Sequence, residues 1–160
     1  GGFAASFASD ERFHALRMPL DQNWKFAVII PDYEVRTADA RRAMPKEIAV
    51  KDSVFTTSHA IAMIVALRSG SEELLAEACQ DVLHEPCRRK LIKDYDSVRA
   101  SAKAAGAPAF FISGSGSTMI ALTKSETVAE RFIELVRARH PNFAGHVLHA
   151  AADGVRVETK

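Results

Sequence analysis

Two apolar segments flank a run of five small residues, and this pattern limits the possible folds more than any other part of the chain. Residues 108–112 and 118–123 carry aromatic and β-branched side chains, which favour strands. Residues 113–117 between them read SGSGS, which has too much glycine to continue a helix. Glycines in such a place ordinarily supply the positive φ angles of a tight turn. This segment therefore predicts two strands joined by a glycine loop.

The rest of the chain predicts strands at both ends of a helical block. Strands are predicted at residues 1–9, 23–31 and 145–151. Helices are predicted at residues 37–44, at 46–69 in one or two pieces, at 71–83, at 94–105 and at 126–139. Strands and helices that are grouped in this way indicate an α+β sandwich, one antiparallel sheet covered by helices.

Capping residues predict where several helices begin and end. Thr37 is expected to cap the first helix, and Pro45 to end it. Gly70 is a predicted stop, and Ser71 begins the next helix, which Pro86 interrupts. Two further signals of the same kind are Gly106 as a stop and Ser125 as an N-cap.

Composition indicates one domain with a real core. The chain has 160 residues, of which 48% are hydrophobic, and a formal net charge of +1. These values suit a single packed domain and do not favour nucleic acid or an anionic membrane as a partner. The longest strongly apolar run covers only residues 60–67, so neither a bilayer-spanning helix nor a secretory signal is expected.

Cysteine and histidine usage predicts neither disulfides nor a metal site. The two cysteines, Cys79 and Cys87, form no CxxC pair and are expected to be free thiols in a reducing cytoplasm. The six histidines are scattered, without the spacing of metal ligands.

The glycine loop is the first candidate for chemistry. Glycines at 114 and 116 would let backbone amides approach a phosphate closely. The loop is not a Walker motif, because no GK[ST] follows it, and Met119 rules out GxGxxG. A tight hairpin turn without any ligand explains the same residues.

Two arginine-containing segments are the other candidates. Thr37 and Arg41, four residues apart, would share a helical face and could hold an amino-acid carboxylate. Pro86 would aim Arg88 out of a helix end. The alternatives are a capped helix with a solvated arginine in the first case and a basic surface turn in the second.

Taken in order, these segments resemble the C-terminal half of the homoserine kinases, a family of the GHMP kinase superfamily. The motifs are GGF at the start, T-x-x-x-R, D-x-V at Asp52 and Val54, QDxLHxPxRxxLI from Gln80, and GAPxFFISGSGST from Gly106. The resemblance runs from Gly1 to about Leu122.

The resemblance implies a ferredoxin-like GHMP kinase C-terminal domain over residues 1–160, with an N-terminal ATP-binding domain absent from this chain. That other half would bind ATP and Mg²⁺, and neither is expected on this chain alone. Thr37, Arg41 and Arg88 would bind L-homoserine. The phosphate loop of the other half would be braced by Ser113, Gly114, Ser115 and Gly116.

The resemblance further implies a transferase of threonine biosynthesis that is cytoplasmic and can form a homodimer. No catalytic residue is expected in this chain, which alone should be inactive. Three positions depart from the family pattern: Ser117 replaces a proline, Cys87 an aromatic residue, and Thr56 an asparagine.

Two other functions fit the same sequence. One is a different GHMP kinase, acting on mevalonate-type or sugar substrates, although paired arginines suit a carboxylate better than a neutral sugar. The other is a non-catalytic module that binds a ligand or a partner.

Overall fold

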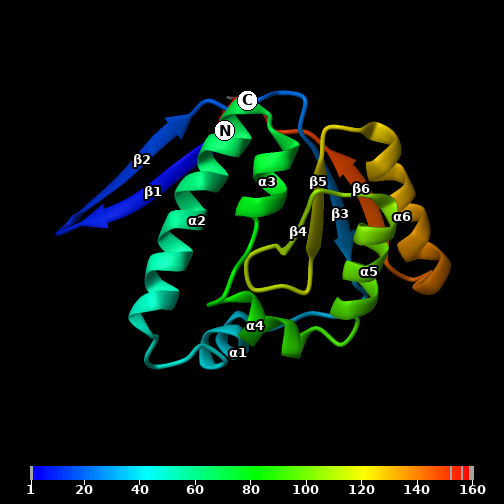
Figure 1. The fold of residues 1–160 in the computed structure, drawn as a ribbon, viewed down its shortest axis with the longest axis horizontal. Helices are drawn as coiled ribbons and strands as arrows, with labels where there is room; N and C mark the ends of the chain where they lie inside the picture. The colour runs from blue at the N-terminus through cyan, green and yellow to red at the C-terminus, as the bar shows by residue number, and fades with distance from the viewer. Residues whose placement is uncertain (1, 152, 156, 159–160) are drawn as a thin grey trace.

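The main sheet of the molecule has four antiparallel strands. The computed structural model describes residues 2–151, 153–155 and 157–158. The strands lie in the order β4-β5-β3-β6 (Figure 1), with bounds β3 Lys25–Ile30, β4 Ala109–Ile112, β5 Met119–Thr123 and β6 Ala144–Leu148. Helices follow β3 and β5, so the main sheet and its helices have the order βαββαβ, the ferredoxin-like arrangement that the family resemblance implied.

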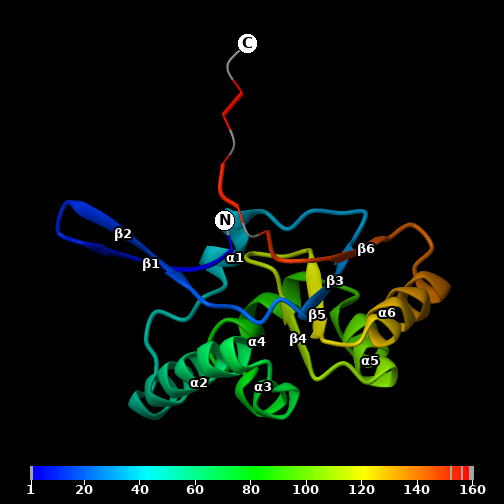
Figure 2. The same cartoon turned by 90° about the horizontal axis from the view of Figure 1, so that it is seen from above.

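Helices cover both faces of this sheet. On one face, α5 (Tyr95–Ala105) and α6 (Glu126–Arg139) bury Ala27 and Ile29 of β3 and Met119 of β5. On the other face, near β4, the helices α2 (Val50–Ser69) and α3 (Glu72–Ala78) enclose a second cluster around Trp24, Leu75 and Leu122. Alternate residues of a strand point to opposite faces, so the two clusters share strands. Figure 2 shows α2 and α3 on one side of β4 and β5, and α5 and α6 on the other side.

Local capping signals form as predicted. Gly70 adopts φ 70° and Gly106 φ 87°, the left-handed conformation that ends α2 and α5. Ser71 accepts the Leu74 amide at 3.1 Å, and Ser125 accepts the Val128 amide at 3.3 Å. These side chains satisfy amides that would otherwise lack partners at a helix start.

Several helix boundaries differ from the prediction. Arg36, not Thr37, occupies the N-cap position of α1 (Thr37–Arg42), and it makes no side-chain cap. The helix predicted at 46–69 begins at Val50 and is a single piece. The helix predicted to reach residue 83 ends at Ala78, so Pro86 interrupts nothing. Pro86 instead lies in the first turn of α4 (Glu85–Arg88), where a missing N–H costs no hydrogen bond; η1 (Arg89–Leu91) follows.

The first strand does not join the main sheet. Strand β1 (Phe3–Ser9) pairs with β2 (Arg12–Met18), which the sequence did not predict, in a separate two-stranded sheet. The expectation of one sheet was therefore wrong for this part of the chain. Arginine and histidine side chains on β2 hide its strand pattern.

Helix α2 is apolar on two sides. Ala66 and Leu67 are buried, whereas Ile61 is 59% and Val65 51% exposed. By length and composition α2 could span a membrane, contrary to the expectation that no helix could. Only 11% of this stretch is buried inside the domain, and its buried residues Ala66 and Leu67 belong to the cluster around Trp24.

Candidate substrate-binding site

The short helix α4 is held at its start by one aspartate. The Asp81 carboxylate accepts the amides of Leu83 at 2.7 Å, His84 at 2.8 Å and Glu85 at 3.2 Å. The Tyr95 hydroxyl donates to the Glu85 carboxylate and so attaches α4 to α5. A four-residue helix has little stability of its own, so these contacts determine where its side chains lie.

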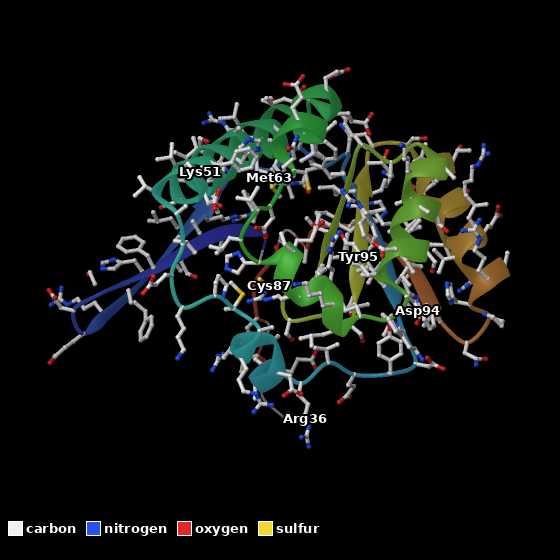
Figure 3. All side chains as sticks on the ribbon, turned by 60° about the horizontal axis from the view of Figure 1, so that its bottom comes forward. Arg36, Lys51, Met63, Cys87, Asp94 and Tyr95 are labelled. Atoms are coloured by element: carbon white, nitrogen blue, oxygen red, sulfur yellow. The ribbon has the colours of Figure 1, made fainter. Side chains whose placement is uncertain are left out.

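Arg88 at the end of α4 contacts the glycine loop. Its Nη1 donates to the Gly114 carbonyl oxygen at 2.7 Å. Its Nε is buried and has no hydrogen-bond partner among the described residues. One end of the guanidinium is thus anchored, while the buried Nε donor has no acceptor within the described chain. Figure 3 shows α4, marked by Cys87, between α2, marked by Met63, and α1, marked by Arg36.

A hollow of about 360 Å³ opens beside this contact, a volume suited to a small ligand. Its lining carries charges of both signs, from Arg88 and from the carboxylates of Asp81 and Glu85. The other lining residues are Met63, Cys79, Gln80, His84, Phe111, Ile112 and Gly114. The two segments that most resemble the family, around Arg88 and around Gly114, therefore meet at one hollow.

The glycine loop is a tight turn, as one of its two interpretations required. The Gly116 amide donates to the Ser113 carbonyl at 3.0 Å, and φ is 58° at Gly114 and 85° at Gly116. A Cβ on Gly116 would lie 2.7 Å from Cδ1 of Ile92, whereas nothing lies within 4 Å of one on Gly114. Gly114 is therefore open to a partner, and Gly116 is packed inside.

The structure shows the surroundings of two of the three side chains that depart from the family pattern, Ser117 and Thr56. Ser117 is buried, and its hydroxyl donates to the Tyr33 carbonyl, a bond that a proline could not make. The Thr56 hydroxyl is buried without a hydrogen-bond partner in the described part of the chain.

Thr37 and Arg41 do not line the hollow beside Arg88. Both are exposed on α1, while the neighbouring Arg42 pairs with Asp39. The structure thus brings Arg88 and the glycine loop together but leaves the predicted Thr37–Arg41 pair outside. Their role in binding substrate stays a prediction.

Sequence reasoning missed the residues that support the site. Asp81 is a fixed residue of the QDxLHxPxRxxLI motif, whereas Glu85 occupies one of its variable positions. An aspartate a few residues before a proline is a signal for a helix start, and it could have been found. Tyr95 could not have been found, because its bond to Glu85 spans ten residues between two helices.

Two titratable side chains at or near the hollow, Cys79 and Tyr95, have pKa values that burial raises, so both are neutral at pH 7. Burial raises the pKa of the Cys79 thiol to about 11. Burial, and then the bond to Glu85, raises the pKa of Tyr95 above its ordinary value. Neither group is suited to act as a nucleophile or base at neutral pH. No group of three or more His, Cys, Asp or Glu able to hold a metal occurs in the described residues.

Comparison with known proteins identifies the class. Residues 63–142, half of the chain, match the family model described as GHMP kinases C terminal. The match includes α4, Arg88 and the glycine loop. The chain belongs to this family, as its motifs indicated.

The particular relatives are homoserine kinases. That of Microchaete diplosiphon is 40% identical over 79% of this chain and 41% of its own length. That of Aquifex aeolicus is 33% identical over 98% of this chain and 54% of its own length. The chain therefore spans about half the length of these curated relatives, or less.

Solved structures that match the fold of this chain include a homoserine kinase. The crystal structure of homoserine kinase from Cytophaga hutchinsonii matches with a TM-score of 0.79 and 29% identity, over 87% of this chain and 45% of that one. The L. major mevalonate kinase structure has a TM-score of 0.72 at 15% identity, over 96% of this chain and 51% of that one, which shows a shared fold.

Proposed function

We propose that this chain is the substrate-binding half of an ATP-dependent kinase that phosphorylates the hydroxyl of L-homoserine, a step of threonine biosynthesis. The observation that carries the proposal is the hydrogen bond from Arg88 to Gly114, because it joins the two most family-like segments at one hollow. The homoserine kinase relatives support the same substrate.

The charges around the hollow suit a free amino acid. Arg88 would bind the carboxylate, since a guanidinium offers several N–H donors to two oxygens. The Asp81 and Glu85 carboxylates line the same hollow and would attract the ammonium group. Arg41 and Thr37 of α1 would complete the grip on the carboxylate. An amino acid bound by both charges has its side-chain hydroxyl left free.

The phosphoryl donor would be ATP with Mg²⁺, bound mainly by a preceding N-terminal half. Phosphoryl transfer depends on positioning and electrostatic stabilisation rather than on covalent chemistry by the protein. Within the described chain the amides of Gly114 and Ser115 donate no hydrogen bond; Gly114 is exposed and Ser115 is half-buried. They could contact the phosphate-binding segment of the other half, with Ser113 and Gly116 shaping the turn. The parent enzyme would be cytoplasmic and could be a homodimer.

A different GHMP substrate is the second candidate, because the fold is shared with a mevalonate kinase. Mevalonate has a carboxylate but no ammonium group. The carboxylates of Asp81 and Glu85 beside Arg88 therefore favour an amino acid.

The test is steady-state ADP formation by the full-length parent protein with L-homoserine, mevalonate or a neutral sugar as acceptor. We expect turnover with L-homoserine and a kcat/KM at least about 100-fold lower with the other two, since a site built to bind a polar group of its substrate discriminates strongly against analogues that lack the group. Equal use of mevalonate, or no use of homoserine, would reject the substrate assignment.

A further inference from the structure

A second hollow adjoins the segment that leads into α4. It has a volume of about 660 Å³, and α3, α5 and strand β4 contribute to its lining. It shares Asp81 and Glu85 with the hollow beside Arg88, but neither Arg88 nor Gly114 lines it. A volume of this size suits a small molecule. The second hollow therefore offers a binding place apart from the proposed homoserine site.

Two basic side chains of α5 line this hollow without partners. Arg99 and Lys103 are four residues apart, so they share one side of the helix. Neither forms an ion pair or donates a hydrogen bond within the described chain. Two positive charges thus lie side by side at one hollow, with no carboxylate paired to either.

The charge of Arg99 reaches the inside of the hollow. Burial raises the pKa of the Cys79 thiol to about 11, and the positive charge of Arg99 acts against this rise. Arg99 also opposes the rise in the pKa of Tyr95 that burial and Glu85 cause. A cation that stabilises the negative form of these two groups would stabilise a bound anion in the same way.

The carboxylates of this hollow already have donors. Asp81 accepts three backbone amides at the start of α4, and Glu85 accepts the Tyr95 hydroxyl. The charged side chains of the lining that still lack a partner in the described chain are therefore basic. An anion would pair with them, whereas a cation would have to compete for carboxylates that are already bonded.

The outer edge of β4 adds a backbone donor. β4 is an end strand of the main sheet, and no described strand pairs with its outer edge. The Cys79 thiol donates to the Phe110 carbonyl at 4.0 Å, so this carbonyl points away from β5. The Phe110 amide points the same way, because the N–H and C=O of one residue in an antiparallel strand lie on the same side. Phe110 lines the hollow, so its amide is available to a ligand there.

We propose that this hollow binds a small anion through a phosphate or carboxylate group, held by Arg99 and Lys103 with the Phe110 amide as a further donor. Phosphate and carboxylate share the chemistry that these donors recognise, since their negative oxygens accept several N–H bonds at once. The proposal is independent of the proposed kinase activity, because neither Arg99 nor Lys103 lines the hollow beside Arg88.

The test is a titration of the isotope-labelled full-length parent protein, followed by NMR, with inorganic phosphate and separately with citrate. We expect one or both anions to shift the amide signals of Arg99, Lys103 and Phe110. A response to phosphate alone assigns a phosphorylated ligand, and a response to citrate alone assigns a carboxylate. In the double variant Arg99→Gln/Lys103→Gln, the apparent Kd at the Phe110 amide should rise at least about tenfold, because two charge-assisted bonds are lost.

The matched control is the double variant Arg131→Gln/Arg139→Gln. It removes the same charge from exposed positions of α6 that do not line the hollow. It should leave the apparent Kd within about twofold, since salt screens exposed charges that do not touch the ligand.

Two results would overturn the proposal. The first is the absence of a shift at these amides with either anion at about 10 mM, ten times the Kd of a weak site. The second is an equal apparent Kd in the two double variants, which would show that the anions associate with the protein only through its net charge. Should Arg99→Gln/Lys103→Gln fail to fold, Lys103→Gln alone and Arg131→Gln alone give the same comparison. None of these measurements uses homoserine or ATP, so the proposed kinase function can stand or fall separately.

Discussion

The Arg88 guanidinium donates one hydrogen bond through Nη1 to the Gly114 carbonyl, while its Nε has no partner among the described residues. In the full-length parent, Arg88→Ala and Arg41→Ala should each lower kcat/KM for homoserine roughly ten- to a hundredfold, because each removes a charge-assisted bond of about 1.5–3 kcal/mol. The KM for ATP should change little. Lysine should restore activity only partly, because it lacks the planar fork of arginine.

The neighbouring arginines are natural controls for these variants. Arg42 pairs with Asp39, and Arg89 is exposed one residue beyond Arg88. Arg42→Ala and Arg89→Ala should leave kcat/KM for homoserine within about twofold, an energy under ~0.5 kcal/mol. If the Arg41 and Arg88 variants match these controls, both residues are surface arginines and the binding roles are wrong.

The two glycines of the loop should respond differently to alanine. Gly114→Ala should lower the free energy of unfolding by about 1 kcal/mol, the cost of a left-handed conformation alone. Gly116→Ala should cost about 2–5 kcal/mol, because its Cβ would also collide with Ile92 at 2.7 Å. Urea unfolding of both variants, followed by circular dichroism, measures the difference. Equal losses would show that Ile92 moves aside freely.

At the scale of the element, the position of α4 depends on the Asp81 carboxylate at its start. Removing the carboxylate leaves three amides at the start of the helix without their acceptor. Asp81→Ala should therefore lower stability by about 1–2 kcal/mol and raise the KM for homoserine, because α4 carries Arg88. Asp81→Asn keeps an acceptor oxygen and should recover much of the stability.

Asp39→Ala is the control for this element. Asp39 lies on another short helix and pairs with Arg42, a half-exposed contact with small effect on stability. Thermal melting and homoserine kinetics should both stay close to those of the parent. An Asp81→Ala variant with unchanged melting and unchanged KM would show that α4 is held by its other contacts, such as Tyr95 with Glu85.

At the scale of the whole molecule, the chain alone should not catalyse phosphoryl transfer. It brings the hollow beside Arg88 and the glycine loop together but, within the described residues, has no group of three or more His, Cys, Asp or Glu able to hold a metal. Homoserine-dependent ATP turnover by the purified 160-residue chain should equal that of a buffer blank. Turnover that survives removal of contaminating kinases would show that this half contains a complete active site.

Most of the fold could be predicted because its signals are local. Gly70, Ser71 and Ser125 act within one helical turn, so their chemistry is visible in a few consecutive residues. The strands β3, β4 and β5 are short apolar segments bounded by turn residues. The order of these elements then restricts the main sheet to few arrangements. The family motifs around Arg88 and the glycine loop were equally visible.

The tertiary structure alone decided what depends on distant contacts. Whether β1 joins the main sheet depends on pairing with β2, and the end of α3 depends on where Asp81 starts the next helix. The Arg88 bond to Gly114 spans 26 residues, and no periodicity within either segment encodes it. Local sequence determines which segments can be helix, strand or turn, because backbone preferences act over a few residues. The packing of separate segments determines which side chains share a site.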